Sequence, residues 1–351
     1  MKNILVTGGC GFIGSHTCLA LLERGYNLLV LDSLVNSSSN VIKKLKEFYK
    51  SQHKHTDNEI TFFKGDIRNE DFLNNSFKNY IKENKKIDAV IHFAGLKSVN
   101  ESTLTPLKYW DFNLRGTINL LNIMEKYDCK NLVFSSSATI YGIKNSDELI
   151  KENFEIKPVN TYGHTKAVIE QILNDLSKLK NQQWRIASLR YFNPIGAHKN
   201  GLIGESPCQN ENNIIPIINK VAAGLIDELL IYGNDWGTHD GTGTRDYIHV
   251  MDLADGHLLA LENILNKKFK YIHLNMGTGK GTSVLELVNT FQKVNKVDIR
   301  YRFCERRKGD VPFLVADNSL ARRLLNWEPK RDLNNMCEDS WNWYKISLKI
   351  L

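Results

Sequence analysis

The stretch Val6-Thr7-Gly8-Gly9-Cys10-Gly11-Phe12-Ile13-Gly14 decides the fold expected of this chain. Its glycines Gly8, Gly11 and Gly14 follow a short apolar run and open a segment with helical apolar spacing. Glycines at this spacing permit a tight turn, a close approach of backbone to a pyrophosphate, and packing of a helix on a strand. The stretch therefore predicts a dinucleotide site on the first strand and helix.

The ends of the following apolar runs carry residues that suit the same ligand. Val30-Leu31-Asp32 ends the next run. A carboxylate there can accept both ribose hydroxyls and repel a 2′-phosphate, which favours NAD over NADP; the alternative is an Asp that caps an ordinary loop. Three more runs end in Gly65-Asp66-Ile67, Phe93-Ala94-Gly95-Leu96-Lys97 and Ser135-Ser136-Ser137. We expect Asp66 to accept from an adenine amino group, and Ala94 and Gly95 to let backbone approach the cofactor; each could also be a simple turn.

Tyr162 and Lys166 lie four residues apart in a segment with helical spacing. Residues four apart share one face of a helix, so the ammonium group can lie beside the phenol and favour its phenolate. Such a pair supplies a base for redox chemistry on a bound dinucleotide. The alternative is a chance match, because a Tyr and a Lys can stand four residues apart on any helix.

Short apolar runs alternate with longer amphipathic segments. The expected strands are 3–7, 27–31, 60–63, 89–93, 131–135 and 187–191, and the expected helices are 15–24, 106–127, 162–179 and, more weakly, 71–84. This alternation predicts an α/β fold with a doubly wound, Rossmann-type parallel sheet and a second, smaller α/β substrate lobe. We expect a first domain over 1–190 and a smaller one over 191–351 that includes a strand and helix near 272–291, with part of 245–264 returning to the first domain. The segment 43–58 is expected to be decoration at the sheet edge.

Composition narrows the class of protein. The 351 residues carry a net charge of +7 without one uninterrupted basic tract, which suits an anionic ligand and does not require nucleic acid. The six cysteines show no CxxC pair and no metal-ligand spacing, so we expect reduced thiols and no metal site. The chain enters a strand pattern at Ile4, no apolar run approaches the ~20 residues of a membrane span, and a cytoplasmic location is expected.

Longer strings in the chain resemble a known family. They are TGGCGFIGSHT (7 to 17), GDIRNE (65 to 70), VIHFAGLKSVNES (90 to 102), FSSSATIYG (134 to 142), LRYFNPIGAH (189 to 198), GTGTRDYIHVMDLADGH (241 to 257) and RRKGDVPFLVAD (306 to 317). They resemble the extended short-chain dehydrogenase/reductase superfamily and, within it, the UDP-glucose (UDP-galactose) 4-epimerases. The resemblance spans nearly the whole chain.

This resemblance implies a reversible inversion at C4 of UDP-galactose and UDP-glucose with a tightly held NAD that is not consumed. It implies that Tyr162 removes the 4-hydroxyl proton, that Lys166 binds the nicotinamide ribose and lowers the pKa of the phenol, and that Ser137 relays or stabilises the proton. The cofactor residues that it implies are Gly8, Gly11, Phe12, Ile13, Gly14, Asp32, Asn36, Asp66, Ile67, Phe93, Ala94, Gly95, Lys97, Asn113, Ser135, Tyr162, Lys166 and Phe192. The substrate residues that it implies are Lys97, Ser137, Thr139, Tyr162, Asn193, Asn213, Ile214, Leu230, Tyr232, Arg245, Val284, Arg307, Asp310 and Leu314. Among these, Arg245 and Arg307 are expected to hold phosphates, Tyr232 the uracil, and Asp310 the uridine ribose.

Leu314 departs from the family pattern, in which this position holds either a bulky Tyr or a small residue and limits N-acetylated sugars. Leucine is intermediate in size, so UDP-N-acetylhexosamines are a further substrate hypothesis. The resemblance also implies a homodimer formed by two helices per subunit, for which 106–127 and 162–179 are the candidates. Packing of these helices on the sheet is the alternative.

Two other functions remain as alternatives. Nucleotide-sugar 4,6-dehydratases typically place an Asp-Glu pair just after the strand that ends in Ser137, and decarboxylases of the superfamily place a Glu there, whereas this chain has Ala138-Thr139. Elimination needs an extra acid and base, so the sequence favours oxidation followed by return of the hydride. A non-catalytic nucleotide sensor is a less favoured alternative, because such proteins usually lack the Tyr or the Lys.

Overall fold

A parallel sheet of seven strands forms the centre of the protein. The computed structural model describes residues 1–52, 59–82, 86–142, 147–206, 213–307 and 310–349. The strand order is β11-β6-β5-β4-β1-β2-β3. The bounds are β1 Asn3–Thr7, β2 Asn27–Asp32, β3 Ile60–Lys64, β4 Ile87–His92, β5 Asn131–Ser137, β6 Arg185–Tyr191 and β11 Tyr271–Met276. The predicted Rossmann-type α/β fold is therefore confirmed.

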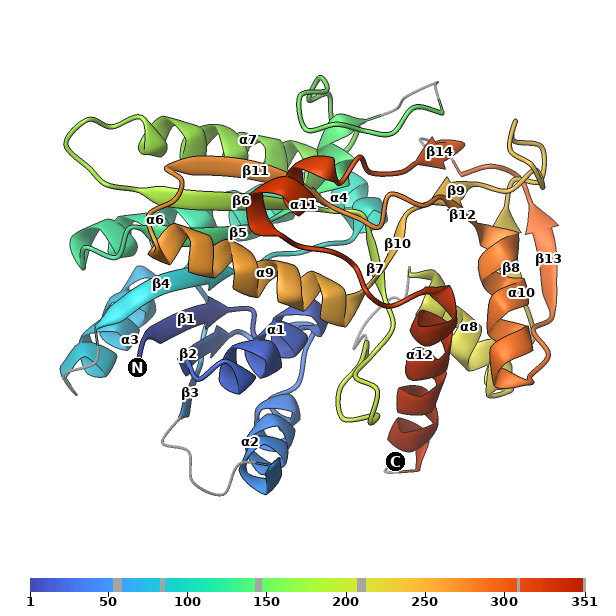
Figure 1. Ribbon diagram of the computed structural model, residues 1–351, viewed down its shortest axis with the longest axis horizontal. Helices are drawn as coiled ribbons and strands as arrows, with labels where there is room; N and C mark the ends of the chain where they lie inside the picture. The colour runs from blue at the N-terminus through green and yellow to red at the C-terminus, as the bar shows by residue number, and fades with distance from the viewer. Residues whose placement is uncertain (53–58, 83–85, 143–146, 207–212, 308–309, 350–351) are drawn as a thin grey trace.

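Helices cover both faces of this sheet (Figure 1). One face packs on α1 Phe12–Glu23, α2 Asn40–Gln52, α9 Val250–Leu265 and α11 Ser319–Leu325. The opposite face packs on α3 Glu70–Lys82, α6 Gly116–Lys126 and α7 Thr161–Ser177. Ile4 and Val6 of β1 belong to the first core and Leu5 to the second, because successive strand residues point to opposite faces. A strand that is buried on both faces has no polar alternation, which explains its continuous apolar run.

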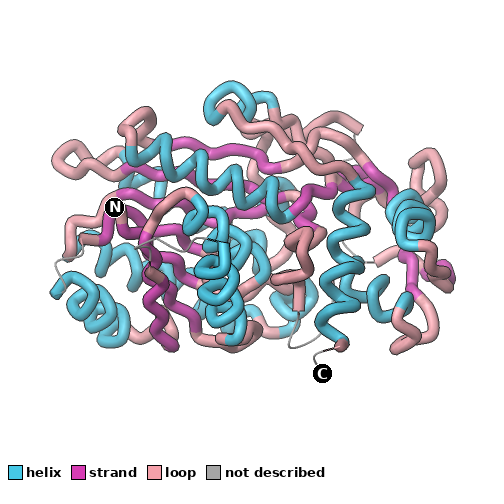
Figure 2. The backbone as a smooth tube through the Cα atoms, turned by 60° about the horizontal axis from the view of Figure 1, so that its bottom comes forward, coloured by secondary structure: helices cyan, strands magenta, loops and turns pink. Residues whose placement is uncertain are grey.

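The smaller lobe lies beyond the carboxyl ends of the sheet strands, and Figure 2 shows the two parts from a second side. Its bounds are β7 Asn193–Ile195, α8 Ile214–Ala222, β8 Leu229–Tyr232, β9 Thr244–Arg245, β10 Tyr247–His249, β12 Thr282–Ser283, α10 Val284–Asn295, β13 Tyr301–Cys304, β14 Phe313–Leu314 and α12 Leu333–Leu348. The helices α8, α10 and α12 share a separate core that contains Ile218, Phe291 and Trp341. No helix in the described part of the chain is long and apolar enough to cross a membrane.

The strand near Ile272 was expected in the smaller lobe, and this expectation is wrong. β11 pairs in parallel with β6 and forms one edge of the main sheet, with Ile272 next to Ala187. The helix α9 precedes it and packs against α1 and the sheet, so 250–276 forms one more helix-strand crossover unit of the sheet. The domain boundary after residue 190 stays a prediction.

The expected decoration at 43–58 is also wrong for the residues described. α2 buries Ile42, Leu45 and Tyr49 in the hydrophobic core to which α1 also contributes. These positions lie on one face of a helix, which the many lysines between them obscure in the sequence. Residues 53–58 lie outside the described residues.

The single helix expected at 106–127 is broken into three pieces. They are α5 Pro106–Tyr109, a π-helix at Trp110–Arg115 and α6, preceded by α4 Val99–Leu104. The π-helix contains the buried Asn113, whose side-chain amide bonds both backbone groups of Leu96. A π-helical turn inserts a residue and turns the side chains, which hydrophobic spacing alone does not reveal.

Candidate active site

The glycine turn connects β1 to α1 at the carboxyl edge of the sheet. Gly8 has a φ of +71°, and a Cβ there would lie 2.7 Å from the backbone nitrogen of Ala94. A Cβ on Gly14 would overlap the carbonyl oxygen of Gly8 and lie 2.9 Å from Gly9 Cα. Only glycine fits these two positions, because the turn packs against the loop after β4 and against its own helix.

Gly11 serves a different purpose in the same turn. It is the N-cap residue of α1, and it makes no side-chain capping bond to the helix. The nearest atom to a Cβ built on Gly11 is Gly8 O, at 3.3 Å. The space beside Gly11 is therefore not filled by the protein itself, and the first N–H groups of α1 have no side-chain cap. A helix start of this kind attracts a phosphate through these N–H groups and the helix dipole.

Asp32 closes this site from the end of β2. Its Oδ2 accepts from the backbone N–H of Cys10 at 2.9 Å, and its Oδ1 accepts from Leu34 N and Ser37 Oγ, both at 2.9 Å. The carboxylate thus holds the glycine turn and its own loop together. Each carboxylate oxygen has two lone pairs, so Oδ1 is fully used by its two bonds, whereas Oδ2 accepts one bond and keeps a lone pair for a ribose hydroxyl.

Asp66 is already paired in the protein. Its carboxylate accepts from the side chain of Arg68, with Nη2 to Oδ2 at 2.6 Å, and Arg68 also pairs with Asp111 at 2.5 Å and stacks on Phe112 at 3.4 Å. Burial pushes the pKa of Asp66 upward, but the hydrogen bonds and charge of Arg68 outweigh burial, and the net pKa is lowered. Asp66 is therefore ionised, and Arg68 already takes up part of its hydrogen-bonding capacity.

The side chains of Ser137, Tyr162 and Lys166 meet at the carboxyl end of β5. Lys166 Nζ donates to the carbonyl oxygen of Ser135 at 2.7 Å and lies 5.8 Å from the centroid of the Tyr162 ring. Ser137 Oγ accepts from the N–H of Thr139 at 3.2 Å and from the Thr139 hydroxyl at 3.0 Å. The N-cap Asn160 starts α7 by accepting from Gly163 N at 2.8 Å, which fixes the first helical turn that carries Tyr162.

Burial dominates the electrostatics of this trio. It raises the pKa of Tyr162, against a lowering hydrogen bond from Ser137. Burial lowers the pKa of Lys166 to about 8, and the charge of Glu170 opposes that change. The phenol is therefore protonated at neutral pH in the protein alone, and a further positive charge beside the ring is needed to favour the phenolate.

The other predicted cofactor residues lie around this edge in different ways. Asn113 Oδ1 accepts from Leu96 N at 2.8 Å and its Nδ2 donates to Thr165 Oγ1 at 3.1 Å, so its side chain braces the loop after β4. Ile67 is buried in the core under α3 and α6, which leaves only its backbone for a ligand. Asn36 is exposed in the loop after β2. Phe192 is buried in a small cluster against which Leu314 packs.

Several predicted substrate residues pair with one another. Glu205 Oε1 accepts from Lys97 Nζ at 2.9 Å and from Asn213 Nδ2 at 2.5 Å, which joins the loop after β4 to the start of α8. Arg245 forms an ion pair with Asp310. The guanidinium of Arg307 lies 3.9 Å above the ring of Tyr232, so this ring face is covered before any uracil arrives.

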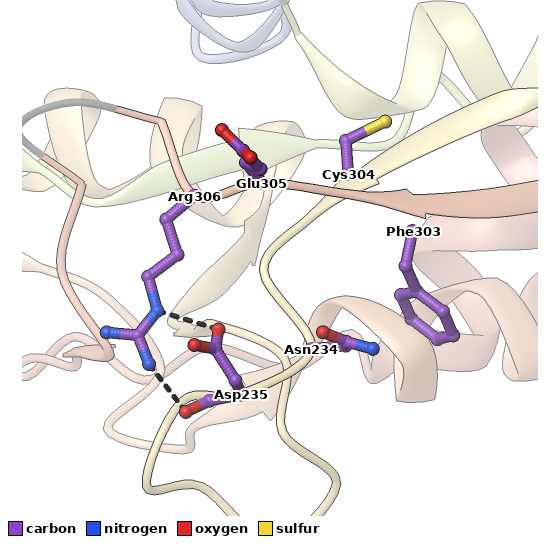
Figure 3. A pocket seen from close by; sticks show the side chains of 6 residues that line it. All are labelled: Asn234, Asp235, Phe303, Cys304, Glu305 and Arg306. Atoms are coloured by element: carbon purple, nitrogen blue, oxygen red, sulfur yellow. Dashed lines mark hydrogen bonds and ion pairs between the residues drawn. The ribbon is translucent and has the colours of Figure 1, made fainter.

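The remaining predicted substrate residues occupy short elements of the smaller lobe. Leu314 of β14 pairs in register with Arg245 of β9, and Asn193 begins β7 and is half-buried. Leu230 lies in β8, and Val284 and Ile214 begin α10 and α8. The side chains of Val284 and Ile214 pack against the core of this lobe. A surface hollow nearby is lined by Asn234, Asp235, Phe303, Cys304, Glu305 and Arg306 (Figure 3). None of the predicted site residues lines it.

Comparison with known proteins decides the family. A sequence profile described as GDP-mannose 4,6 dehydratase matches residues 5–340. A UDP-glucose 4-epimerase of Bacillus subtilis (strain 168) is 49% identical over 340 residues, which cover 97% of this chain and 96% of the relative. The chain belongs to the UDP-glucose 4-epimerase family.

Two solved structures show that the likeness to this epimerase family extends to the fold. The epimerase of Stenotrophomonas maltophila, with bound NAD and formylated UDP-arabinopyranose, has a TM-score of 0.92 and 43% identity, with 100% of each chain covered. The epimerase of Bifidobacterium longum, in complex with NAD+ and UDP, has a TM-score of 0.90 and 39% identity, again with 100% of each chain covered. Both complexes hold a dinucleotide and a uridine nucleotide on the same overall fold.

The epimerase-family fold also reveals residues that the sequence patterns did not single out. Glu205, Glu170, Arg190, Tyr191 and His257 are buried and bonded close to the predicted site residues. Glu170 could have been found from its position four residues after Lys166, and the others gave no local signal. Among the described residues, no group of three or more His, Cys, Asp or Glu side chains could hold a metal ion.

Proposed function

We propose that this protein is an NAD-dependent UDP-glucose 4-epimerase that interconverts UDP-galactose and UDP-glucose through a transient 4-keto sugar. The observation that carries this proposal is the meeting of Tyr162, Lys166 and Ser137 at the sheet edge that also bears the glycine turn. The 49% identity to an epimerase over nearly the whole chain supports it. The space beside Gly11 and the helix start without a side-chain cap fit a pyrophosphate, and Asp32 fits the ribose of NAD.

The residues of the site have distinct roles in this reaction. Bound NAD supplies reversible acceptance of the hydride from C4 of the sugar. Tyr162 takes the 4-hydroxyl proton through Ser137, which is within hydrogen-bonding reach of the phenol. Lys166, held on the carbonyl of Ser135, keeps a positive charge beside the phenol. Burial raises the pKa of Tyr162, so the positive ring of a bound cofactor would have to add to the charge of Lys166 to favour the phenolate. The base is therefore active only in the loaded enzyme.

Inversion requires that the hydride return to the opposite face of C4 in the 4-keto sugar, while the proton returns to the carbonyl oxygen. Tyr162 gives back the proton that it took, and return of the hydride would leave the sugar with no net change in oxidation state. Lys97, Asn213, Arg245 and Arg307 hold the uridine diphosphate while the sugar turns. Anchoring by the diphosphate leaves the hexose free to present either face to the same catalytic groups.

The dehydratase alternative lacks the groups that its chemistry needs. The matching profile bears a dehydratase name, but Ala138 is buried at the start of a 3-10 helix and Thr139 bonds Ser137. Neither side chain can serve as the extra acid or base of an elimination. Product analysis therefore distinguishes the two activities: an epimerase returns UDP-glucose from UDP-galactose, whereas a dehydratase releases a 4-keto-6-deoxy sugar.

The test of this proposal is coupled product analysis with UDP-galactose on wild type and on Tyr162→Phe. We expect loss of most activity in the variant, with NAD still bound, because phenylalanine keeps the ring packing and loses only the hydroxyl. Near-normal turnover by Tyr162→Phe would remove Tyr162 from the mechanism. Absorbance near 340 nm on addition of UDP-galactose to the NAD-loaded protein tests the sensor alternative, since an inert spectrum without product would favour it.

We also propose that UDP-N-acetylhexosamines are substrates. Leu314 packs beside Phe192 and Ala138 and offers less bulk than a tyrosine, without a phenolic hydroxyl. A rate comparison on UDP-galactose and UDP-N-acetylgalactosamine tests this proposal, with Leu314→Tyr as the matched variant that should lose only the second activity. No turnover of the N-acetylated sugar by wild type would refute it.

We also propose that the protein is a homodimer and that it is located in the cytoplasm. The apolar side chains of Leu104, Leu107, Ile118 and Val168 are 81%, 82%, 39% and 37% exposed along α4, α5, α6 and α7. A second copy that packs on this surface would cover them. Light scattering on the purified protein should give twice the mass of one chain, and Val168→Glu should reduce the mass to that of one chain.

The cysteines at the five described positions are all free, which agrees with a reducing compartment.

A further inference from the structure

A buried ion pair lies one helical turn from Lys166. Glu170 follows Lys166 by one turn on α7, and Arg190 lies on β6. Arg190 Nη2 and Glu170 Oε2 are 2.6 Å apart, and the two side chains are only 2% and 4% exposed. Removing two charges from water is costly, and well-packed apolar residues often serve stability as well or better. A pair in this place therefore points to a purpose besides stability.

The bonds of this pair run into the catalytic edge of the sheet. Ser136 Oγ donates to Glu170 Oε1 at 2.5 Å, and the neighbouring Ser135 provides the carbonyl that accepts from Lys166. Arg190 Nη1 donates to the hydroxyl of Tyr141 at 2.8 Å and to the carbonyl of Glu152 at 2.9 Å. The pair is thus fixed from both sides, and its carboxylate cannot move toward or away from Lys166 without breaking several buried bonds.

We propose that Glu170 and Arg190 are positioning residues that set the charge state of Lys166. Glu170 keeps the buried ammonium protonated, and Arg190 holds Glu170 in place while it limits how strongly the carboxylate attracts Lys166. This inference rests on the role proposed above for Lys166. Both residues are buried and neither is among the predicted cofactor or substrate residues, yet the inference gives them control of the cation on which the tyrosine base depends.

The other groups around Lys166 cannot replace this carboxylate. His92 of β4 faces it, but burial, together with the charge of Lys166, lowers the pKa of His92 to about 3, so the imidazole is neutral. The Phe134 ring of β5 lies 4.8 Å from the ammonium and the Tyr162 ring 5.8 Å. Burial lowers the pKa of Lys166 to about 8 even with Glu170 present. The pKa of Lys166 is therefore close enough to neutral pH that a change in one neighbouring charge alters its protonation.

The two members of the pair should shift the pKa of Lys166 in opposite directions. Glu170→Gln removes the attracting charge and should lower it by about one pH unit or more, whereas Arg190→Gln removes a repelling charge and should raise it. The double variant Glu170→Gln/Arg190→Gln should lie between them. A purely structural role predicts that both single variants disturb the site in the same way.

The experiment measures the pKa of Lys166 by NMR of ¹³C-labelled lysine side chains in the purified, NAD-loaded protein. The Lys166 signal is assigned by its disappearance in Lys166→Met. The matched control is Glu262→Gln, which breaks the exposed Arg24–Glu262 ion pair between α1 and α9 and should leave the Lys166 signal unchanged. The alkaline limb of the kcat profile should move with the NMR value in each variant.

Opposite shifts in the two single variants support the inference. Shifts of the same sign, or no shift in either, overturn it, even if the enzyme epimerises UDP-galactose. Conversely, opposite shifts in a protein without epimerase activity would uphold the electrostatic pair and refute the proposed function. If a single variant does not fold, Arg190→Lys and the double variant replace it: Arg190→Lys should leave the pKa unchanged because it keeps the charge, and a shift there overturns the inference.

Discussion

Gly11 and Gly14 belong to one turn, yet replacing each with alanine should have different consequences. At Gly11 the φ of −72° and ψ of 172° suit alanine, and an added methyl meets only Gly8 O, at 3.3 Å. Alanine is a poorer N-cap than glycine by up to about 1 kcal/mol, but it restricts the unfolded chain by a similar ~0.4–1 kcal/mol. The free energy of unfolding of the NAD-free protein should therefore stay within about 1 kcal/mol of wild type.

The same methyl should nevertheless weaken NAD binding, because it occupies the space through which a pyrophosphate reaches the start of α1. Loss of one hydrogen bond to a charged group is worth ~1.5–3 kcal/mol, so the Kd for NAD should rise by about tenfold to a hundredfold. Gly14→Ala is the contrasting variant. Its methyl overlaps Gly8 O within the protein, so overpacking should lower the free energy of unfolding of the NAD-free protein by roughly 1–3 kcal/mol.

Urea unfolding of NAD-free protein, followed by tryptophan fluorescence, measures the first quantity, and titration with NAD measures the second. Added NAD should also raise the urea midpoint of wild type much more than that of Gly11→Ala. An unchanged Kd in Gly11→Ala would show that no phosphate approaches this residue. A Gly11→Ala protein as unstable as Gly14→Ala would refute the division of roles within the turn.

Three further predictions concern buried polar groups. Burial lowers the pKa of His16 to about 3, of His92 to about 3 and of His257 to about 4, so these side chains stay neutral in the folded protein while the unfolded chain takes up protons below its ordinary histidine pKa. These three histidines should therefore contribute a fall in stability of up to about 4 kcal/mol per pH unit as pH drops from ~6 to ~4. In urea midpoints against pH, His16→Asn should reduce the slope by up to about 1.4 kcal/mol per pH unit, and an unchanged slope would contradict the account. Asp246 is buried and accepts from Thr278 N, Gly279 N and Ala316 N at 2.7, 2.9 and 3.1 Å. Asp246→Ala leaves these donors unpaired and should therefore lower the free energy of unfolding by ~3–5 kcal/mol. A loss under ~1 kcal/mol in urea unfolding would argue against this. Burial raises the pKa of Cys10, Cys129 and Cys337 to about 12 each. A thiol reagent at pH 8 should therefore modify Cys304 in the native protein and these three cysteines only after unfolding. Fast labelling of Cys10 in the native state would contradict this prediction.

Much of the fold was predictable from local patterns. The six strands expected from apolar runs are all present, because a parallel strand buried on both faces must be apolar throughout. The expectations that were wrong, for β11, α2 and the helix at 106–127, have a common cause. The residues of β11 look like any short strand, and only pairing with β6 makes it an edge of the main sheet. The lysines of α2 conceal a buried face of three residues, and the π-helix depends on the bonds of Asn113 to a distant loop.

The sequence by itself determined the chemistry available to this protein. It placed glycines where backbone must approach closely, an Asp at the end of β2, and a Tyr and a Lys one helical turn apart. These features are local, since strand ends and helical turns fix their spacing within a few residues. Only the tertiary structure decided which charges surround them. Asp111 beside Arg68, Glu205 beside Lys97, and Arg190 beside Glu170 come together from segments that lie apart in the chain. Burial and neighbouring charge set a pKa, and both depend on residues far apart in the chain.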